Sequence, residues 1–144
     1  PRREQAGVPV AVTGMAQVGV GGVKKVQVAV LPRGQEWPAN DPYRTKAPWR
    51  DAQLLPAPTN WGGELKDGKL PAGVSNFTDA GRPKHWPQRY TLAHWATLLK
   101  GLKPGDYDVF CRTIDDKGIA QPLPRPFKKS GRNAISKAEL TVEK

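Results

Sequence analysis

Valine recurs at every second position in two segments near the start of the chain. In residues 8–12 it alternates with proline and alanine, and in residues 26–30 with glutamine and alanine. This period of two places the valines on one face of an extended chain, which predicts a half-buried β-strand in each segment. Residues 14–22, between them, are rich in glycine and suit a sharp reversal. We therefore expect two strands that pair antiparallel through a glycine-rich connection.

The second half of the chain shows the same period after a proline-glycine turn. Pro104-Gly105 precedes residues 107–113, where tyrosine, valine, cysteine and threonine occupy alternate positions. A tyrosine that opens a strand after such a turn predicts a tyrosine corner, in which the hydroxyl bonds back to nearby backbone. Residues 115–118, Asp-Asp-Lys-Gly, predict a turn, and residues 138–142 predict a last strand.

Residues 32–90 lack a sustained period. They contain nine prolines and four of the five tryptophans. Residues 49–54 are compatible with a short edge strand, and residues 65–70 predict a small hairpin around an Asp-Gly turn. A connection of this length is unusual in a compact domain, so we interpret it as an insertion that lies across the sheets. The residues expected to pin it, and to offer an interface, are Trp37, Trp49, Trp61 and Trp86.

Residues 90–102 have an ambiguous pattern. Leu92, Trp95 and Leu99 follow the spacing of a helix, whereas alternate residues from Thr91 to Thr97 follow that of a strand. Periodicity alone favours a helix here.

Composition and charge indicate one soluble domain that spans residues 1–144. Glycine and proline together contribute 30 residues, which favours many turns and argues against a helical bundle. Lysine and arginine exceed aspartate and glutamate by 23 to 13, so the net charge is +10. The basic residues are scattered, which favours a solvated basic exterior and disfavours nucleic acid as a partner. No stretch is long and apolar enough to predict a membrane span.

The residue types that perform catalysis or bind metals are sparse. His85, His94 and Cys111 are the only histidines and cysteine, and nothing close in sequence completes a metal-binding set. We interpret Cys111 as a buried thiol on a strand. No Ser–His–Asp or Cys–His arrangement is supported, so we assign no catalytic, cofactor-binding or metal-ligating residue to the chain.

One segment has the composition of a nucleic-acid site. Residues 82–90 interleave basic and aromatic side chains, which can neutralise phosphates and stack on bases. The simpler interpretation, which we favour, is a loop held by a buried Trp86 with its charges in solvent.

Several of these segments, in this order, resemble the C-terminal dimerisation domain of the sulfite oxidase family of molybdopterin oxidoreductases. The family pattern Gly-x-Ala-x-x-Gly is similar to Gly14, Ala16 and Gly19, and its following strand is similar to residues 26–30. A tryptophan, an alanine and a leucine of the family match Trp49, Ala52 and Leu54. Trp95 lies where the family has an aromatic-rich strand. On that resemblance we expect a strand, not a helix, over residues 90–98.

The most specific match is a signature of the form Arg-Ala-x-Asp-x-x-Gly-x-x-Gln-Pro. Its defining residues correspond to Arg112, Asp115, Gly118, Gln121 and Pro122. We expect the glycine to adopt a positive φ and the aspartate to cap the turn or to pair with the arginine. We expect the side-chain amide of the glutamine to offer hydrogen bonds to the edge of a sheet.

The chain departs from the family after this signature. Family members continue with Trp-Asn-x-x-Gly-Tyr-x-x-Asn, which residues 127–133 match through Gly131 and Asn133. Sulfite-oxidising members often have an arginine just before that glycine, and this chain has Ser130. An active-site arginine is therefore not assigned here.

The resemblance implies an immunoglobulin-like β-sandwich with a long Pro/Trp-rich insertion at residues 32–90. It implies a non-catalytic dimerisation module whose partners are its own molybdenum domain and a second copy. Molybdopterin-molybdenum would belong to the parent oxidoreductase and not to this chain. A periplasmic location follows if that parent is an exported bacterial enzyme. The alternative function is a stand-alone basic sandwich that binds nucleic acid or an acidic polysaccharide.

Overall fold

The prediction of an all-β fold is confirmed. The computed structural model describes residues 2–59, 70, 72–122 and 134–144. Within them, the regular elements are strands. They are β1 (Arg2–Gln5), β2 (Val10–Ala16), β3 (Val23–Pro32), β4 (Arg50–Leu54), β5 (Ala93–Leu99), β6 (Gly105–Asp115), β7 (Ala120–Gln121) and β8 (Ser136–Glu143).

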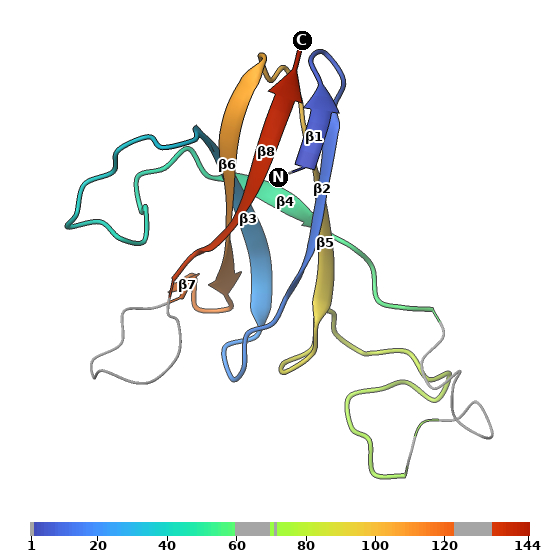
Figure 1. The fold of residues 1–144 in the computed structure, drawn as a ribbon. Helices are drawn as coiled ribbons and strands as arrows, with labels where there is room; N and C mark the ends of the chain where they lie inside the picture. The colour runs from blue at the N-terminus through green and yellow to red at the C-terminus, as the bar shows by residue number, and fades with distance from the viewer. Residues whose placement is uncertain (1, 60–69, 71, 123–133) are drawn as a thin grey trace.

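The strands form one mixed sheet that is nearly closed into a barrel (Figure 1). Its order is β1-β8-β6-β3-β4-β5-β2, and β7 pairs with β6 beside this path. Strands β1 and β8 run parallel, whereas the other pairs are antiparallel. The two ends of the path approach each other, because Arg2 of β1 donates from Nη1 to the carbonyl oxygen of Ala11 in β2 at 2.5 Å.

The core lies inside this curved sheet. Inward positions of β2, β3, β6 and β8 supply mostly valine and leucine, as the alternation in the sequence predicts. The buried members of the cluster are Val10, Ala16, Val23, Val26, Val28, Ala52, Trp95, Val109, Leu140 and Val142. Burial of these apolar side chains is the main stabilising contribution to the fold.

An extra residue in β3 explains an irregularity in its valines. Val23 and Val26 are three apart, yet both are buried. The register of β3 against β6 shifts between Val23 and Lys25, which marks a β-bulge. One inserted residue reverses which side chains face inward, so both valines reach the same core.

The predicted pairing of the first two valine-rich segments is wrong. Strand β2 pairs with β5, and β3 pairs with β4 and β6. The glycine-rich connection does not close a hairpin but turns at Gly19–Gly22, where the amide of Gly22 donates to the carbonyl of Gly19 at 3.2 Å. It carries the chain across the molecule to a different part of the sheet.

Strand β4 is interior rather than an edge. It pairs with β3 through residues 50–52 and with β5 through Gln53 and Leu54. This short strand joins the two parts of the sheet, so the insertion that was predicted to be irregular contributes a structural strand.

The strand expected from the resemblance at residues 90–98 is confirmed, although it begins later, at Ala93. Ala93 and Trp95 are buried whereas Leu92 and Leu98 are exposed, which is the period of a strand. Cross-strand pairing with β2 therefore overrides the helical spacing of the leucines.

Residues 33–49 cover the outer face of β3 and β6, on the side away from β2 and β5 (Figure 1). A second apolar group is buried beneath them, made of Ala29, Leu31, Ala47 and Phe110. Because both faces of this part of the sheet are covered, the second half of β3, residues 28–32, is a continuous apolar run. The insertion therefore lies across the sheet here, as predicted.

Several predicted features lie outside the described residues. They are Trp61, the hairpin at residues 65–70 apart from Leu70, and the segment with Ser130, Gly131 and Asn133.

Candidate functional site

The signature aspartate caps the turn between β6 and β7. Asp115 is 5% exposed, and its Oδ1 accepts hydrogen bonds from the amides of Lys117 at 3.0 Å and Ile119 at 2.8 Å. Gly118 follows with a φ of 81°, a conformation that favours glycine. The predicted capping role and the predicted positive φ are both confirmed. The alternative pairing of the aspartate with Arg112 is not what the structure contains.

Arg112 instead binds across the sheet. Its Nε donates to Oε1 of Gln27 at 2.9 Å, and its guanidinium lies 4.3 Å from the ring centroid of Trp49. Burial lowers the pKa of Arg112, and the nearby Asp41 carboxylate partly opposes this effect. The arginine thus stacks on an aromatic ring at the border of the insertion, a contact worth about 0.5–2 kcal/mol.

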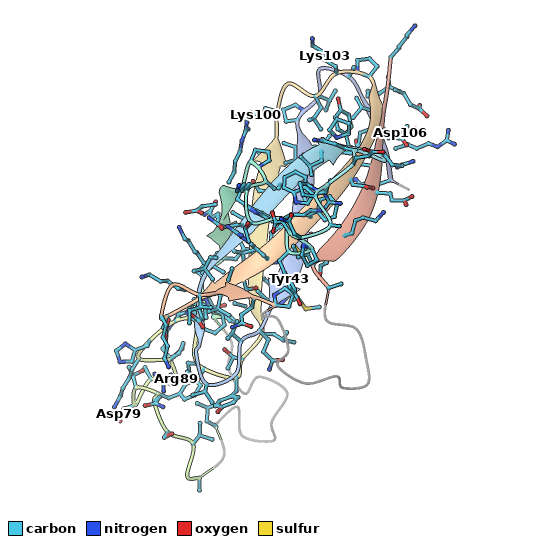
Figure 2. All side chains as sticks on the ribbon, turned by 90° about the vertical axis from the view of Figure 1, so that its left-hand side faces the viewer. Tyr43, Asp79, Arg89, Lys100, Lys103 and Asp106 are labelled. Atoms are coloured by element: carbon cyan, nitrogen blue, oxygen red, sulfur yellow. The ribbon has the colours of Figure 1, made fainter. Side chains whose placement is uncertain are left out.

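The last two signature residues close this site. Gln121 pairs with Thr113 through the backbone, and the Gln121–Pro122 peptide is cis. They border a pocket of 210 Å³ whose other walls include Tyr43, Ile119 and Ile135. Tyr43 faces the viewer in Figure 2, on the outer side of the sheet. The signature therefore frames an apolar hollow beside an arginine.

The tyrosine corner predicted at the start of β6 is present. The hydroxyl of Tyr107 donates to the carbonyl oxygen of Lys103 at 2.9 Å, across the Pro104-Gly105 turn. This bond fixes the entry of the chain into the central strand. It lies at the opposite end of the molecule from the signature turn, near Lys103 in Figure 2.

The described tryptophans of the insertion make contacts within the chain. Trp37 Nε1 donates to Oδ2 of Asp41 at 3.1 Å, and Trp49 Nε1 donates to the carbonyl oxygen of Arg44 at 2.8 Å. Trp86 Nε1 donates to the carbonyl oxygen of Leu55 at 2.8 Å. All three rings are half-buried. These three hydrogen bonds join residues of the insertion to one another.

Arg44 is a residue that sequence reasoning missed. Its guanidinium lies between the rings of Trp37, at 5.1 Å, and Phe110, at 4.4 Å. Its φ of 50° is in the left-handed region, which is strained for an arginine. The only local signal is its place between two tryptophans in sequence, because Phe110 comes from a strand far along the chain.

The basic and aromatic segment at residues 82–90 meets the signature turn. In the β2–β3 connection, Gly19 leaves room for the ring of Tyr90, and Gly22 leaves room for the aliphatic part of Arg89. At Gly22 a side chain would also meet Oδ2 of Asp116 at 2.8 Å. A pocket of 570 Å³ lies there, lined by His85, Arg89, Tyr90 and Asp116 among others. Figure 2 places Arg89 at this end of the molecule.

The candidate metal ligands remain apart. His85 lies in the loop of residues 82–90, His94 is on β5 and Cys111 is on β6. Within the described ranges, no three histidine, cysteine or carboxylate side chains gather into a metal-binding group. Cys111 is half-buried, and desolvation raises the pKa of its thiol, opposed in part by a hydrogen bond from Ser136.

No protein-family model matches the chain, and no curated protein matches it. In the part of the chain that the structure describes, no helix has the length and hydropathy needed to cross a bilayer.

Proposed function

We propose that this chain is a non-catalytic contact module, similar to the dimerisation domain of sulfite-oxidase-like molybdopterin oxidoreductases. In this proposal the nearly closed sheet is a variant of an immunoglobulin-like sandwich in which β4 bridges the two layers. The module packs against a molybdenum domain of its parent and against a second copy of itself.

The observation that carries the proposal is how the signature residues are used. Asp115 is buried and accepts two backbone amides, while Arg112 is held by Gln27 and Trp49. Oδ1 of Asp115 and Nε of Arg112 are therefore used within the fold, which supports a structural role for the signature. A signature whose polar groups build a turn and a stacked surface is expected in a module that makes contacts.

The cofactor of the proposed parent does not fit the residues of this chain. The one thiol, Cys111, lies on the inner side of β6, and burial disfavours the thiolate that a metal would need. We therefore place molybdopterin in the parent, outside this module, and assign it no contact here.

Sedimentation equilibrium tests the proposal. The 144-residue chain, and any longer protein that contains it, are measured over a wide range of concentrations. We expect a monomer–dimer equilibrium, because a two-fold contact between identical surfaces closes at two copies. A longer protein that stays monomeric at every concentration contradicts the proposal.

A second candidate function, binding of a polyanion, is favoured by one observation. Arg82, Lys84, His85 and Arg89 are exposed on a single loop beside the 570 Å³ pocket that Tyr90 also lines. Exposed cations next to an aromatic ring are the composition that single-stranded nucleic acid requires.

The two candidates separate in a titration with heparin or single-stranded DNA. Polyanion binding would weaken steeply with salt and would be lost when Arg82, Lys84 and Arg89 are replaced by glutamine. Replacing Lys24, Lys100 and Lys137 removes the same formal charge elsewhere and is the matched control. Equal loss in both triple variants would indicate attraction by net charge alone.

A further inference from the structure

A chain of hydrogen bonds crosses β4, β3 and β6 and ends at Arg112. Gln27 is the cross-strand partner of both Asp51 and Arg112. The Asp51 carboxylate accepts from Nζ of Lys25 at 2.9 Å and from Nε2 of Gln27 at 2.8 Å. Oε1 of Gln27 then accepts from Nε of Arg112 at 2.9 Å. Because both ends of the Gln27 amide are engaged, the chain fixes the orientation of the Arg112 guanidinium.

The same guanidinium has an unused edge. One face lies over the ring of Trp49, and Nε is bound by Gln27. Within the described part of the chain, Nη1 and Nη2 of Arg112 make no hydrogen bond or ion pair. A partly desolvated cation without an acid in contact is unfavourable, so an anion at this edge would be stabilising.

Arg112 lines the 210 Å³ hollow that the signature frames. Among the described walls of this hollow, Arg112 is the only charged side chain, and Ile119, Pro122 and Ile135 supply apolar surface. The volume is below the roughly 300–1,000 Å³ of sites for drug-sized ligands. The hollow therefore suits a small molecule with an apolar body and one anionic end.

The geometry of the donors favours a carboxylate as this anionic end. The two oxygens of a carboxylate match the paired N–H groups of a guanidinium edge. A phosphate would bring a further charged oxygen, which apolar walls leave without a donor. A neutral ligand would leave the charge of Arg112 uncompensated.

We propose that the hollow beside Arg112 binds a small aliphatic monocarboxylate, whose oxygens accept hydrogen bonds from the Nη edge while its apolar part contacts Ile119 and Pro122. Gln27 acts as a positioning residue through its bond to Nε. This binding function goes beyond the proposed contact function and does not depend on it. A free acid and the C-terminus of a peptide that ends in leucine share this chemistry.

Titration of the 144-residue chain, followed by nuclear magnetic resonance, tests the site. The probe is isovalerate, and the signal is the Nε–H resonance of Arg112, identified by its absence in Arg112→Lys. We expect a dissociation constant on the order of 1 mM. Isovaleramide has nearly the same shape without the charge and should bind at least tenfold more weakly. N-acetyl-leucine represents the peptide end, and the tighter binder of the two acids identifies the source.

Two variants separate a binding role from a structural one. Arg112→Lys keeps the charge but loses the paired donors, so isovalerate should bind at least tenfold more weakly. Gln27→Met removes the orienting bond at equal length and charge. It should weaken isovalerate several-fold and leave the weak binding of isovaleramide unchanged, which a general loss of structure would not do. Arg82→Lys, on an exposed loop, is the control. Circular dichroism verifies that each variant is folded.

The outcomes are distinct from those for the contact function. Selective binding of either acid that Arg112→Lys and Gln27→Met weaken, and Arg82→Lys does not, supports the site. If Arg112→Lys does not fold, Gln27→Met decides. Equal binding of isovalerate and isovaleramide, unchanged binding in the two variants, or no shift with either acid up to about 50 mM overturns the site. Sedimentation of the same samples without ligand tests dimerisation independently, so either result can fail alone.

Discussion

Gly14 is required by the position of one buried aromatic ring. An added Cβ at this glycine would lie 2.5 Å from Cζ2 of Trp95, on the strand that pairs with it. Trp95 is 4% exposed, so its ring has little room to move away. Gly14 therefore leaves the space that the ring of Trp95 needs to pack inside the sheet.

Replacing Gly14 with alanine is expected to destabilise the fold by about 1–3 kcal/mol, because overpacking forces the tryptophan off its position. In an ordinary strand the same change would stabilise by up to about 1 kcal/mol. Urea unfolding measures the difference. Gly19→Ala is the control, since its nearest atom is a ring carbon of Tyr90 at 3.4 Å and the site is exposed. Equal stability of Gly14→Ala and the wild type would contradict the packing argument.

The half-buried thiol of Cys111 gives a prediction that depends on pH. Burial raises the pKa of this thiol, so the folded chain holds its proton at a pH where the unfolded chain has begun to ionise. The stability that the neutral thiol contributes is present below the ordinary pKa of about 8.5 and is lost as the pH rises through the folded value. Because the thiolate is the nucleophile, modification at about pH 8 should be at least tenfold slower in the folded than in the unfolded chain.

An exposed thiol on the neighbouring strand provides the control for Cys111. Ala138 is exposed on β8, so Ala138→Cys in a Cys111→Ser background should react quickly while folded. Absorbance on reaction with an aromatic disulfide follows both rates. Equal rates for the two folded proteins would mean that Cys111 is not shielded.

At the scale of elements, the sequence predicts strands well and their partners poorly. The period of two identifies β2, β3, β6 and most of β8, because alternation is a local property. The pairing of β2 with β5 joins residues about 80 apart, and no local pattern encodes it. The bulge in β3 and the interior place of β4 are set by tertiary contacts in the same way.

In the candidate site too, local features could be predicted from the sequence and contacts between distant segments could not. Asp115 and Gly118 were predictable because turn chemistry is local. The stack of Arg112 on Trp49, and of Arg44 between Trp37 and Phe110, joins segments that are distant in sequence. Composition gives only the expectation that tryptophans pin the insertion.

Arg44 tests how the insertion is attached to the sheet. Arg44→Ala removes the guanidinium between two rings but keeps the backbone groups that bind Trp49 and Ala47. Its Nη1 is buried without a hydrogen bond in the described part of the chain, and the cost of burying this polar atom offsets some of the stacking energy. We expect a loss of about 1 kcal/mol in the free energy of unfolding.

The same change should loosen residues 33–49 more than the rest of the molecule. Hydrogen exchange measured by mass spectrometry is expected to accelerate in this segment and to remain unchanged in β5, because local opening follows local contacts. Lys46→Ala, at an exposed residue of the same segment, is the control. Uniform acceleration throughout the chain would instead indicate a global loss of stability.

At the scale of the whole molecule, a net charge of +10 opposes any approach of two copies. The described ion pairs lie mostly on β1, β8 and the neighbouring end of β6. When two like-charged copies meet through an apolar contact, the electrostatic interaction between them is therefore repulsive and long-ranged. The electrostatic interaction between the basic loop at residues 82–90 and an acidic partner would instead be attractive.

Salt distinguishes these two kinds of contact without any substitution. Raising sodium chloride from about 50 mM to about 500 mM shortens the screening length from about 14 Å to about 4 Å, so repulsion between two copies weakens. Dimerisation through an apolar contact should therefore strengthen several-fold, whereas binding of heparin should weaken by orders of magnitude. Sedimentation and fluorescence titration measure the two responses. A dimer that dissociates as salt rises would show that ion pairs hold it, and would exclude an uncharged interface.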